Sequence, residues 1–155
     1  MAVRPLTLAP QMMAAIPTPQ IGYVGASQTF KEGSPLILST QQLVIATTTP
    51  TTGLVGVAAA NAPAVQGAAF PYYPLLPGLV LEVTLAGAAS AATVLAAASH
   101  LQLLVGLTLV TATGFWYADT SVTSCATIIG FRDPVGTTDA RVYIVIDSDV
   151  AVYNT

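Results

Sequence analysis

The chain has 155 residues, of which 54% are hydrophobic and only 7% are charged, and its formal net charge at pH 7 is −3. This length fits one domain with its own core, but the charged fraction is far below the roughly 25% of an average globular protein. The few scattered basic residues exclude a nucleic-acid partner, which requires clustered Lys and Arg. Another protein or a membrane is therefore expected to cover much of the surface.

Residues 1–20 contain four prolines (at positions 5, 10, 17 and 19), which exclude a long helix or a central strand. We expect an extended arm, up to about 60 Å long at roughly 3.3 Å per residue. Its apolar side chains would be unusual in a free tail, so they are candidate contacts with a neighbouring molecule, the alternative being that the arm folds back on its own domain: Leu6, Leu8, Met12, Met13 and Ile16. The first residues show no charged segment followed by an apolar one, so no signal peptide is expected and synthesis in the cytoplasm follows.

Residues 21–155 are predicted to form a single β-domain, a small barrel or sandwich, because short apolar stretches alternate with Gly and Pro. Strands are expected at Pro35–Ser39, Gln42–Ala46, Leu54–Ala60 and Leu79–Leu85, with a Thr-rich loop over Thr47–Thr52. No internal repeat can be registered in the sequence.

The segment Pro71–Pro77 places its prolines three residues apart, which is the period of polyproline II. Tyr72 and Tyr73 would then lie on the other two edges of that helix. A ligand for an SH3-type domain would need a basic anchor nearby, and none is present. We expect this segment to pack on the barrel or on a neighbouring subunit.

Residues 83–118 contain no Asp, Glu, Lys or Arg, and the stretch 85–110 is long enough to span a bilayer. It is rich in Ala, Gly, Ser and Thr and lacks basic flanks and an aromatic belt, so strands covered by protein are favoured over a membrane protein. One short helix over Ser90–Ser99 is expected from the alanines. Strands at Leu103–Val110 and Phe115–Asp119 should then flank a turn.

The C-terminal part predicts two strands, Thr127–Asp133 and Arg141–Asp147, around a type I turn at 133–136. Val142, Ile144 and Ile146 would face the core, while Arg141, Tyr143 and Asp147 would face the other way. Arg132 with Asp133 and Arg141 with Asp139 could form two ion pairs on this hairpin. Surface pairs of this kind stabilise by at most about 1 kcal/mol, so strand register and the choice of partner are the roles expected of them.

The residues with reactive side chains form no catalytic pattern. His100 could in principle join Ser99 or Ser124 and Asp119, but no nucleophile elbow or oxyanion loop surrounds them. Asp147 and Asp149 would make only half of a calcium site. Cys125 is the single cysteine and is expected to be a buried apolar side chain. We therefore expect no enzyme activity, cofactor or metal.

Short motifs in order along residues 28–147 carry a resemblance to a known family. They are F-K-E-G-S-P-L at 30–36, L-V-G-V-A at 54–58, Y-P-L-L-P-G at 73–78, W-Y-x-D at 116–119, G-F-x-D-P-V-G-T at 130–137 and R-V-Y-I-V-I at 141–146. In this order they resemble small decoration, or cement, proteins of tailed bacteriophage capsids. The Ala-rich stretch 86–98 and the N-terminal arm have no counterpart in that pattern.

The resemblance implies a structural protein of the virion that binds the major capsid protein on the outer capsid surface, as a symmetric oligomer such as a homotrimer. Candidate interface residues are the arm side chains together with Tyr72, Tyr73, Trp116, Arg132 and Arg141. One alternative is a carbohydrate-binding β-sandwich with Trp116, Tyr117, Tyr72 and Tyr73 as an aromatic platform. A second alternative is the membrane protein spanning through 85–110.

Overall fold

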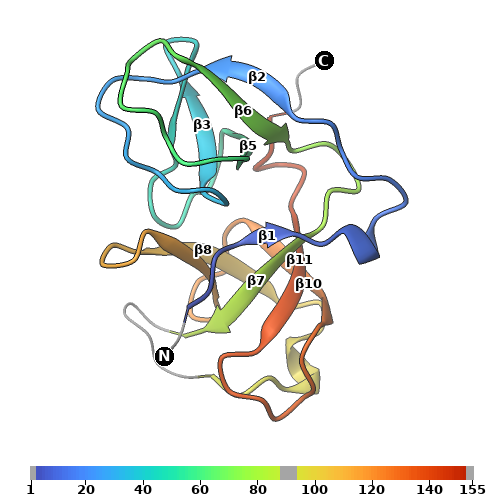
Figure 1. Ribbon diagram of the computed structural model, residues 1–155. Helices are drawn as coiled ribbons and strands as arrows, with labels where there is room; N and C mark the ends of the chain where they lie inside the picture. Colours follow the sequence, from blue (N-terminus) through green and yellow to red (C-terminus); the bar gives the residue numbers. More distant parts are fainter. Residues whose placement is uncertain (1–2, 88–93, 153–155) are drawn as a thin grey trace.

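The computed structural model describes residues 3–87 and 94–152 and shows a mainly β fold with two sheets, as predicted (Figure 1). The elements occur in this order: β1 (Thr7–Leu8), the 3-10 turn η1 (Pro10–Met12), β2 (Gln20–Tyr23), β3 (Pro35–Ser39), β4 (Gln42–Ile45), β5 (Leu54–Ala58), β6 (Ala69–Pro74), β7 (Leu81–Ala86), η2 (Ala98–His100), β8 (Leu104–Val110), β9 (Phe115–Asp119), β10 (Ala126–Phe131) and β11 (Arg141–Ile146). We call β2–β6 the first lobe and β7–β11 the second lobe.

The two lobes have the same topology. The strand order is β2-β6-β5-β3-β4 in the first lobe and β7-β11-β10-β8-β9 in the second. Numbered within each lobe, both orders read 1-5-4-2-3. In both, the third strand also runs parallel to the first, through a bridge between Val24 and Leu43 in one lobe and through the β7–β9 pairing in the other. The chain is therefore a topological repeat of a five-stranded barrel.

A continuous hydrophobic cluster joins the lobes. In the second lobe it contains buried side chains from every strand, among them Leu81, Leu107, Trp116, Ile128 and Ile144, and it continues into the first lobe through Leu54, Val57 and Leu75. A separate cluster around Phe30, Leu36 and Phe70 fills the first lobe. Each fully buried side chain of this size stabilises the fold by roughly 1.5–3 kcal/mol before entropy costs.

The expected strands are found to within a few residues, but the polyproline prediction is wrong. Residues 69–74 form β6, in which Phe70, Tyr72 and Pro74 are buried at alternate positions between β2 and β5. A proline in a strand lacks only one backbone hydrogen bond, the one that its missing N–H would donate. The carbonyl of Pro71 still accepts the N–H of Ala59 at 3.2 Å, so the strand is maintained.

The helix expected over Ser90–Ser99 is absent from its described part, and residues 90–93 lie outside the described residues. Leu95 is extended and bridges to Thr138, and only the short turn η2 follows. The backbone at Ala96 bonds to Thr137 instead of to its own turn, so tertiary pairing overrides alanine's helix propensity. Within the described part of the chain, no helix is long and apolar enough to cross a membrane, and the described part of 85–110 consists of the end of β7, η2 and β8.

The turn between β10 and β11 also differs from the prediction. The closing bond joins the Thr137 N–H to the Pro134 carbonyl at 3.1 Å, and Gly136, at the third position of the turn, has φ of +91°. A positive φ at this position is typical of type II, not type I. Asp133 does not cap the turn. Its Oδ2 accepts the N–H of Arg141 at 2.8 Å.

The N-terminal arm is extended, as expected, and its first half folds back on its own domain, which is the alternative given above. Thr7 and Leu8 pair antiparallel with Glu82 and Leu81 of β7 (Figure 1). Leu6 is buried in the cluster that joins the lobes. The arm therefore adds a sixth strand to the second lobe and closes part of its edge.

A single glycine tests how closely the arm is packed. Gly33 has φ of +85°, and a Cβ at this position would overlap the carbonyl oxygen of Leu6. We expect Gly33→Ala to displace the arm and to lower the free energy of unfolding by roughly 1–3 kcal/mol for the overlap, in addition to about 1–2 kcal/mol for the left-handed backbone. Urea unfolding and limited proteolysis at the arm measure both effects.

Gly136→Ala is the matched control, because Gly136 has φ of +91° and no atom within 4 Å of the added Cβ. This variant carries the backbone cost alone. Equal losses of stability in the two variants, with the arm equally resistant to protease, would show that the arm is not held at Gly33.

Candidate interaction surface

Five of the eleven charged residues form a cluster where the arm meets β7 and β11. Glu82 Oε1 of β7 accepts a hydrogen bond from Arg141 Nε of β11 and another from Arg132 Nη1, each at 2.8 Å. The Arg141 and Glu82 side chains are only 4% and 9% exposed. A buried ion is tolerated only when it is paired and hydrogen-bonded, so the geometry of this pair is a condition of the fold.

β7 and the arm together supply the remaining bonds of the Arg141 guanidinium. Arg141 donates to the Glu82 carbonyl (3.0 Å), to Thr84 Oγ1 (3.3 Å), to the Arg4 carbonyl (3.4 Å) and to Thr7 Oγ1 (3.4 Å). The Arg4 N–H donates to Thr84 Oγ1 at 3.2 Å, and the Arg4 guanidinium pairs with Asp133 at 3.3 Å. The arm thus completes the hydrogen bonding of Arg141 while it excludes water from it.

Burial and ion pairing shift the pKa values of Glu82 and Arg141 in opposite directions. Burial tends to raise the pKa of Glu82, but hydrogen bonds from Arg141 and Arg132 outweigh it and hold that pKa below its ordinary value of 4.5. For Arg141 burial is the larger effect and lowers the pKa, with Glu82 opposing it. Arginine titrates so far above neutral pH that both partners remain charged.

These contacts correct two expectations about the hairpin. The guanidinium groups of Arg132 and Arg141 pair with Glu82, not with the neighbouring aspartates. Glu82 lies on the adjacent strand β7, diagonally across from Arg141, whose own register partner is Thr84. Arg141 is buried within its own chain and therefore does not form an interface as predicted. Arg132 is half exposed and remains accessible at the edge of the cluster.

The aromatic residues expected at the surface are mostly internal. Trp116, Tyr117 and Tyr72 are 1%, 1% and 6% exposed, and the Tyr72 hydroxyl donates to Gln20 Oε1 at 3.3 Å. The prediction of Trp116 and Tyr72 at an interface is therefore wrong, because both pack inside the lobes. Tyr73 is half buried. The aromatic platform of a carbohydrate-binding module is not formed by these residues.

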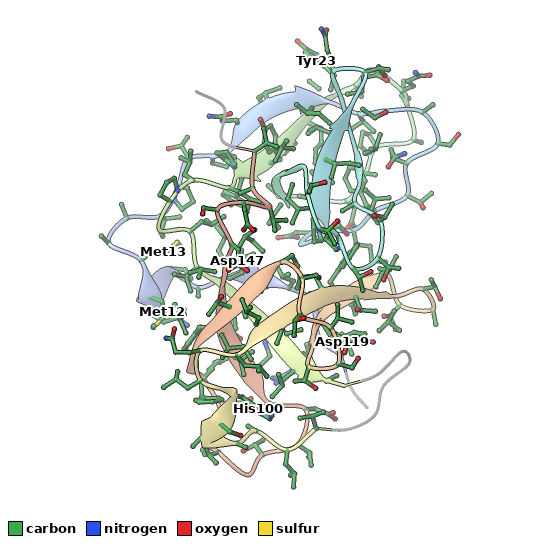
Figure 2. The ribbon with its side chains drawn as sticks, turned by 180° about the vertical axis from the view of Figure 1, so that it is seen from behind. Met12, Met13, Tyr23, His100, Asp119 and Asp147 are labelled. Carbon is green, nitrogen blue, oxygen red and sulfur yellow. The ribbon has the colours of Figure 1, made fainter. Side chains whose placement is uncertain are left out.

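An apolar groove does lie at the surface, between the arm and the connection from β6 to β7. It is lined by residues 13–17 on one side and 76–79 on the other, and it has a volume of ≈ 320 Å³. Ile16 and Leu76 border it with 63% and 44% of their surfaces exposed, and Met12 nearby is 42% exposed. Figure 2 shows Met12 and Met13 at the turn of the arm, on the flank of the molecule. Leu6 is buried and Leu8 half buried, so of the five arm residues only Met12, Met13 and Ile16 contribute to this surface.

Sequence reasoning missed a second exposed apolar surface, on β2. Ile21 and Tyr23 are 63% and 57% exposed, and Tyr23 projects from the far end of the first lobe (Figure 2). The alternation of Ile21 and Tyr23 around Gly22, directly after Pro19, is the signal that could have identified an outward-facing edge strand.

Figure 2 shows His100, Asp119 and Asp147 at three separate places. His100 Nδ1 accepts the N–H of Ala97 at 3.1 Å and so stabilises η2. Asp119 is buried and accepts hydrogen bonds from Thr108 Oγ1 (3.1 Å) and from the N–H of Ser121 (2.9 Å). Asp147 Oδ1 accepts the Thr127 hydroxyl at 2.8 Å. In residues 3–87 and 94–152 no group of three or more His, Cys, Asp or Glu side chains could hold a metal ion.

No protein-family model, curated protein or solved structure matches the chain.

The buried cluster predicts a stability that depends on Glu82. The pKa of Glu82 in the folded state is lowered, so its carboxylate stabilises the fold above about pH 4.5, and this contribution is lost as the pH falls through the folded-state pKa. Glu82→Gln leaves Arg141 without its counter-ion, and we expect a loss of roughly 3–5 kcal/mol at pH 7. Chemical denaturation at several pH values measures it.

Glu32→Gln is the matched control, since Glu32 is exposed. We expect it to change stability by less than about 0.5 kcal/mol and to retain the acid sensitivity of the wild type, whereas Glu82→Gln should show a flatter dependence below pH 4.5. If both variants follow the wild-type curve, Glu82 does not stabilise the folded state through its charge.

Proposed function

We propose that this protein is a structural virion protein, a decoration protein that binds the major capsid protein on the outer surface of a tailed-phage capsid and reinforces the shell. The observation that carries this proposal is a surface with few charges and several large exposed apolar side chains. The whole chain has only 4 basic and 7 acidic residues, and of its three ion pairs in the described residues the pair of Glu82 with Arg141 is buried. Ile16 and Ile21, each 63% exposed, and Tyr23, 57% exposed, lie at the surface. Exposed apolar patches on a folded protein usually mark contacts with other proteins.

The resemblance of the sequence motifs to capsid decoration proteins supports the same function, including assembly as a homotrimer. Attachment would occur through the groove between residues 13–17 and 76–79, where Ile16 and Leu76 offer apolar contact. Each contact buries a small area, and an oligomer that engages several sites at once gains retention from their combination. This function requires no catalysis and no cofactor.

Two alternatives have less support. Carbohydrate binding would need exposed stacking aromatics, and Trp116, Tyr117 and Tyr72 are buried. A membrane-spanning role would have rested on residues 85–110, whose described part contains strands and a short 3-10 turn.

The groove gives a direct test of capsid attachment. We expect Ile16→Asp and Leu76→Asp each to weaken retention on purified capsids by about tenfold or more, because a carboxylate at an apolar contact loses the burial energy of the side chain and must be desolvated. Co-sedimentation with capsids stripped of the protein measures the bound fraction. Val65→Asp is the control, since Val65 is 66% exposed and lies outside the groove.

Wild-type protein that does not bind the stripped capsids would overturn the proposed function. Binding that survives in both groove variants would instead move the attachment site elsewhere.

His100 tests the absence of a catalytic role. His100→Ala should leave capsid retention unchanged and cost about 1 kcal/mol of stability, because only the bond from the Ala97 N–H is lost. Thermal unfolding and co-sedimentation are the two measurements. Any turnover in the wild type that disappears in this variant would contradict a purely structural role.

A further inference from the structure

The topological repeat makes the first strands of the two lobes comparable. Val24, the residue directly after β2, bridges to the third strand of its lobe, as Leu85 of β7 does in the other lobe. This equivalence places Ile21 where the second lobe has Glu82, and Tyr23 where it has Thr84. Glu82 and Thr84 are covered by the arm, whereas Ile21 and Tyr23 are 63% and 57% exposed.

The outer edge of β2 is also open to hydrogen bonding. Val24 forms two backbone hydrogen bonds with the chain that leads into β6. Its N–H donates to the Ala68 carbonyl (3.1 Å), and its carbonyl accepts the Gly67 N–H (2.8 Å). Because bonding direction alternates along an antiparallel ladder, Ile21 and Tyr23 turn their N–H groups away from β6. In the described part of the chain β2 is an end strand of its sheet. β4 packs against it, but the backbone pairing with β4 is confined to the bridge between Val24 and Leu43. The edge over residues 19–23 is therefore unpaired.

We propose that this edge pairs with the same edge of a second copy of the chain, antiparallel and about a two-fold axis at Ile21. The outward side chains at 19, 21 and 23 read Pro, Ile, Tyr, so antiparallel pairing sets Ile21 against Ile21 and Tyr23 against Pro19. The segment contains no charged residue, so two identical edges meet without like-charge repulsion, which would otherwise disfavour self-association.

The backbone of this segment fits the same register. The two Ile21 residues exchange a pair of hydrogen bonds, and the Tyr23 N–H of each copy donates to the Pro19 carbonyl of the other. The reciprocal bond, from residue 19 of one copy to the Tyr23 carbonyl of the other, cannot form because Pro19 has no N–H. The Tyr23 carbonyl lies beside β4 in its own chain. Pairing therefore ends at Pro19, and the contact forms a dimer instead of an open-ended sheet. Such a closed two-fold contact is isologous.

The size of the contact sets its strength. An edge of five residues buries well below the roughly 1,000 Å² expected of a stable interface, so we expect a dissociation constant of roughly 10 μM to 1 mM. Sedimentation equilibrium of the full chain over this range should show a mass that rises with concentration above that of Ile21→Lys at the same concentration. Val65→Lys, at a site of similar exposure, should behave as the wild type.

Cysteine pairs test the geometry directly. In a hydrogen-bonded antiparallel pair the Cα atoms are about 5.5 Å apart, within the range of a disulfide. We expect Ile21→Cys to form a disulfide-linked dimer under mild oxidation at least about tenfold faster than Val65→Cys. The native Cys125 does not interfere, because it is fully buried and burial raises the pKa of its thiol to about 11.

Mixing two further variants fixes the register. Pro19→Cys and Tyr23→Cys should cross-link efficiently with each other and poorly with themselves, because the two-fold axis sets residue 19 opposite residue 23. Equal masses of wild type and Ile21→Lys at every concentration, or cross-linking of Ile21→Cys no faster than that of Val65→Cys, would overturn the proposal. Preferential self-linking of Pro19→Cys would overturn the antiparallel register. None of these outcomes depends on capsid binding.

Discussion

The buried ion pair between Glu82 and Arg141 constrains the rest of the second lobe. Placing two charges in a poorly hydrated site costs several kcal/mol per ion, and the cost is offset only if pairing and hydrogen bonding are nearly complete. The sheet alone does not complete them, because the guanidinium of Arg141 also bonds to the backbone of Arg4 and the side chain of Thr7. The arm is therefore part of the fold, and its removal would expose the buried ion pair of Glu82 and Arg141 to water.

This arrangement also determines the character of the outer surface. The chain has few charges, and Glu82 and Arg141 are withdrawn from the surface, so few charged side chains remain there, among them Lys31, Glu32 and Asp149. Large apolar side chains such as Ile16, Ile21 and Tyr23 are exposed as well. A surface of this kind favours association with protein over binding of ions or nucleic acid, and the capsid proposal rests on it.

The sequence predicted most strands correctly, because alternating burial leaves a period of two that can be read locally. It failed where partners are distant in the chain. Arg132 and Arg141 were assigned to neighbouring aspartates, whereas Glu82 lies 50 and 59 residues away. The polyproline II prediction for β6 is wrong because proline spacing is visible in the sequence, whereas the pairing of Tyr72 with β2 and β5 is not.

At the surface, the prediction includes the groove residues Met13 and Ile16, but it omits the exposed Tyr23 and includes the buried Trp116. The repeat escaped detection because the lobes share strand order without sharing side chains at equivalent positions.

That divergence explains why the arm covers the second lobe, although β2 follows it directly in the chain. The outer face of β7 presents Glu82 and Thr84, with Arg141 adjacent. Thr84 Oγ1 accepts the Arg4 N–H, and the Arg141 guanidinium donates to the Arg4 carbonyl and to the Thr7 hydroxyl. The equivalent face of β2 presents Ile21 and Tyr23, whose side chains offer the arm no hydrogen-bonding partner apart from the unpaired backbone of β2. The turn η1 and the prolines that follow it then return the chain to the first lobe. The two lobes thus share one topology but differ in their first strands. The polar β7 requires the arm as a cover, whereas the apolar β2 remains available to another molecule.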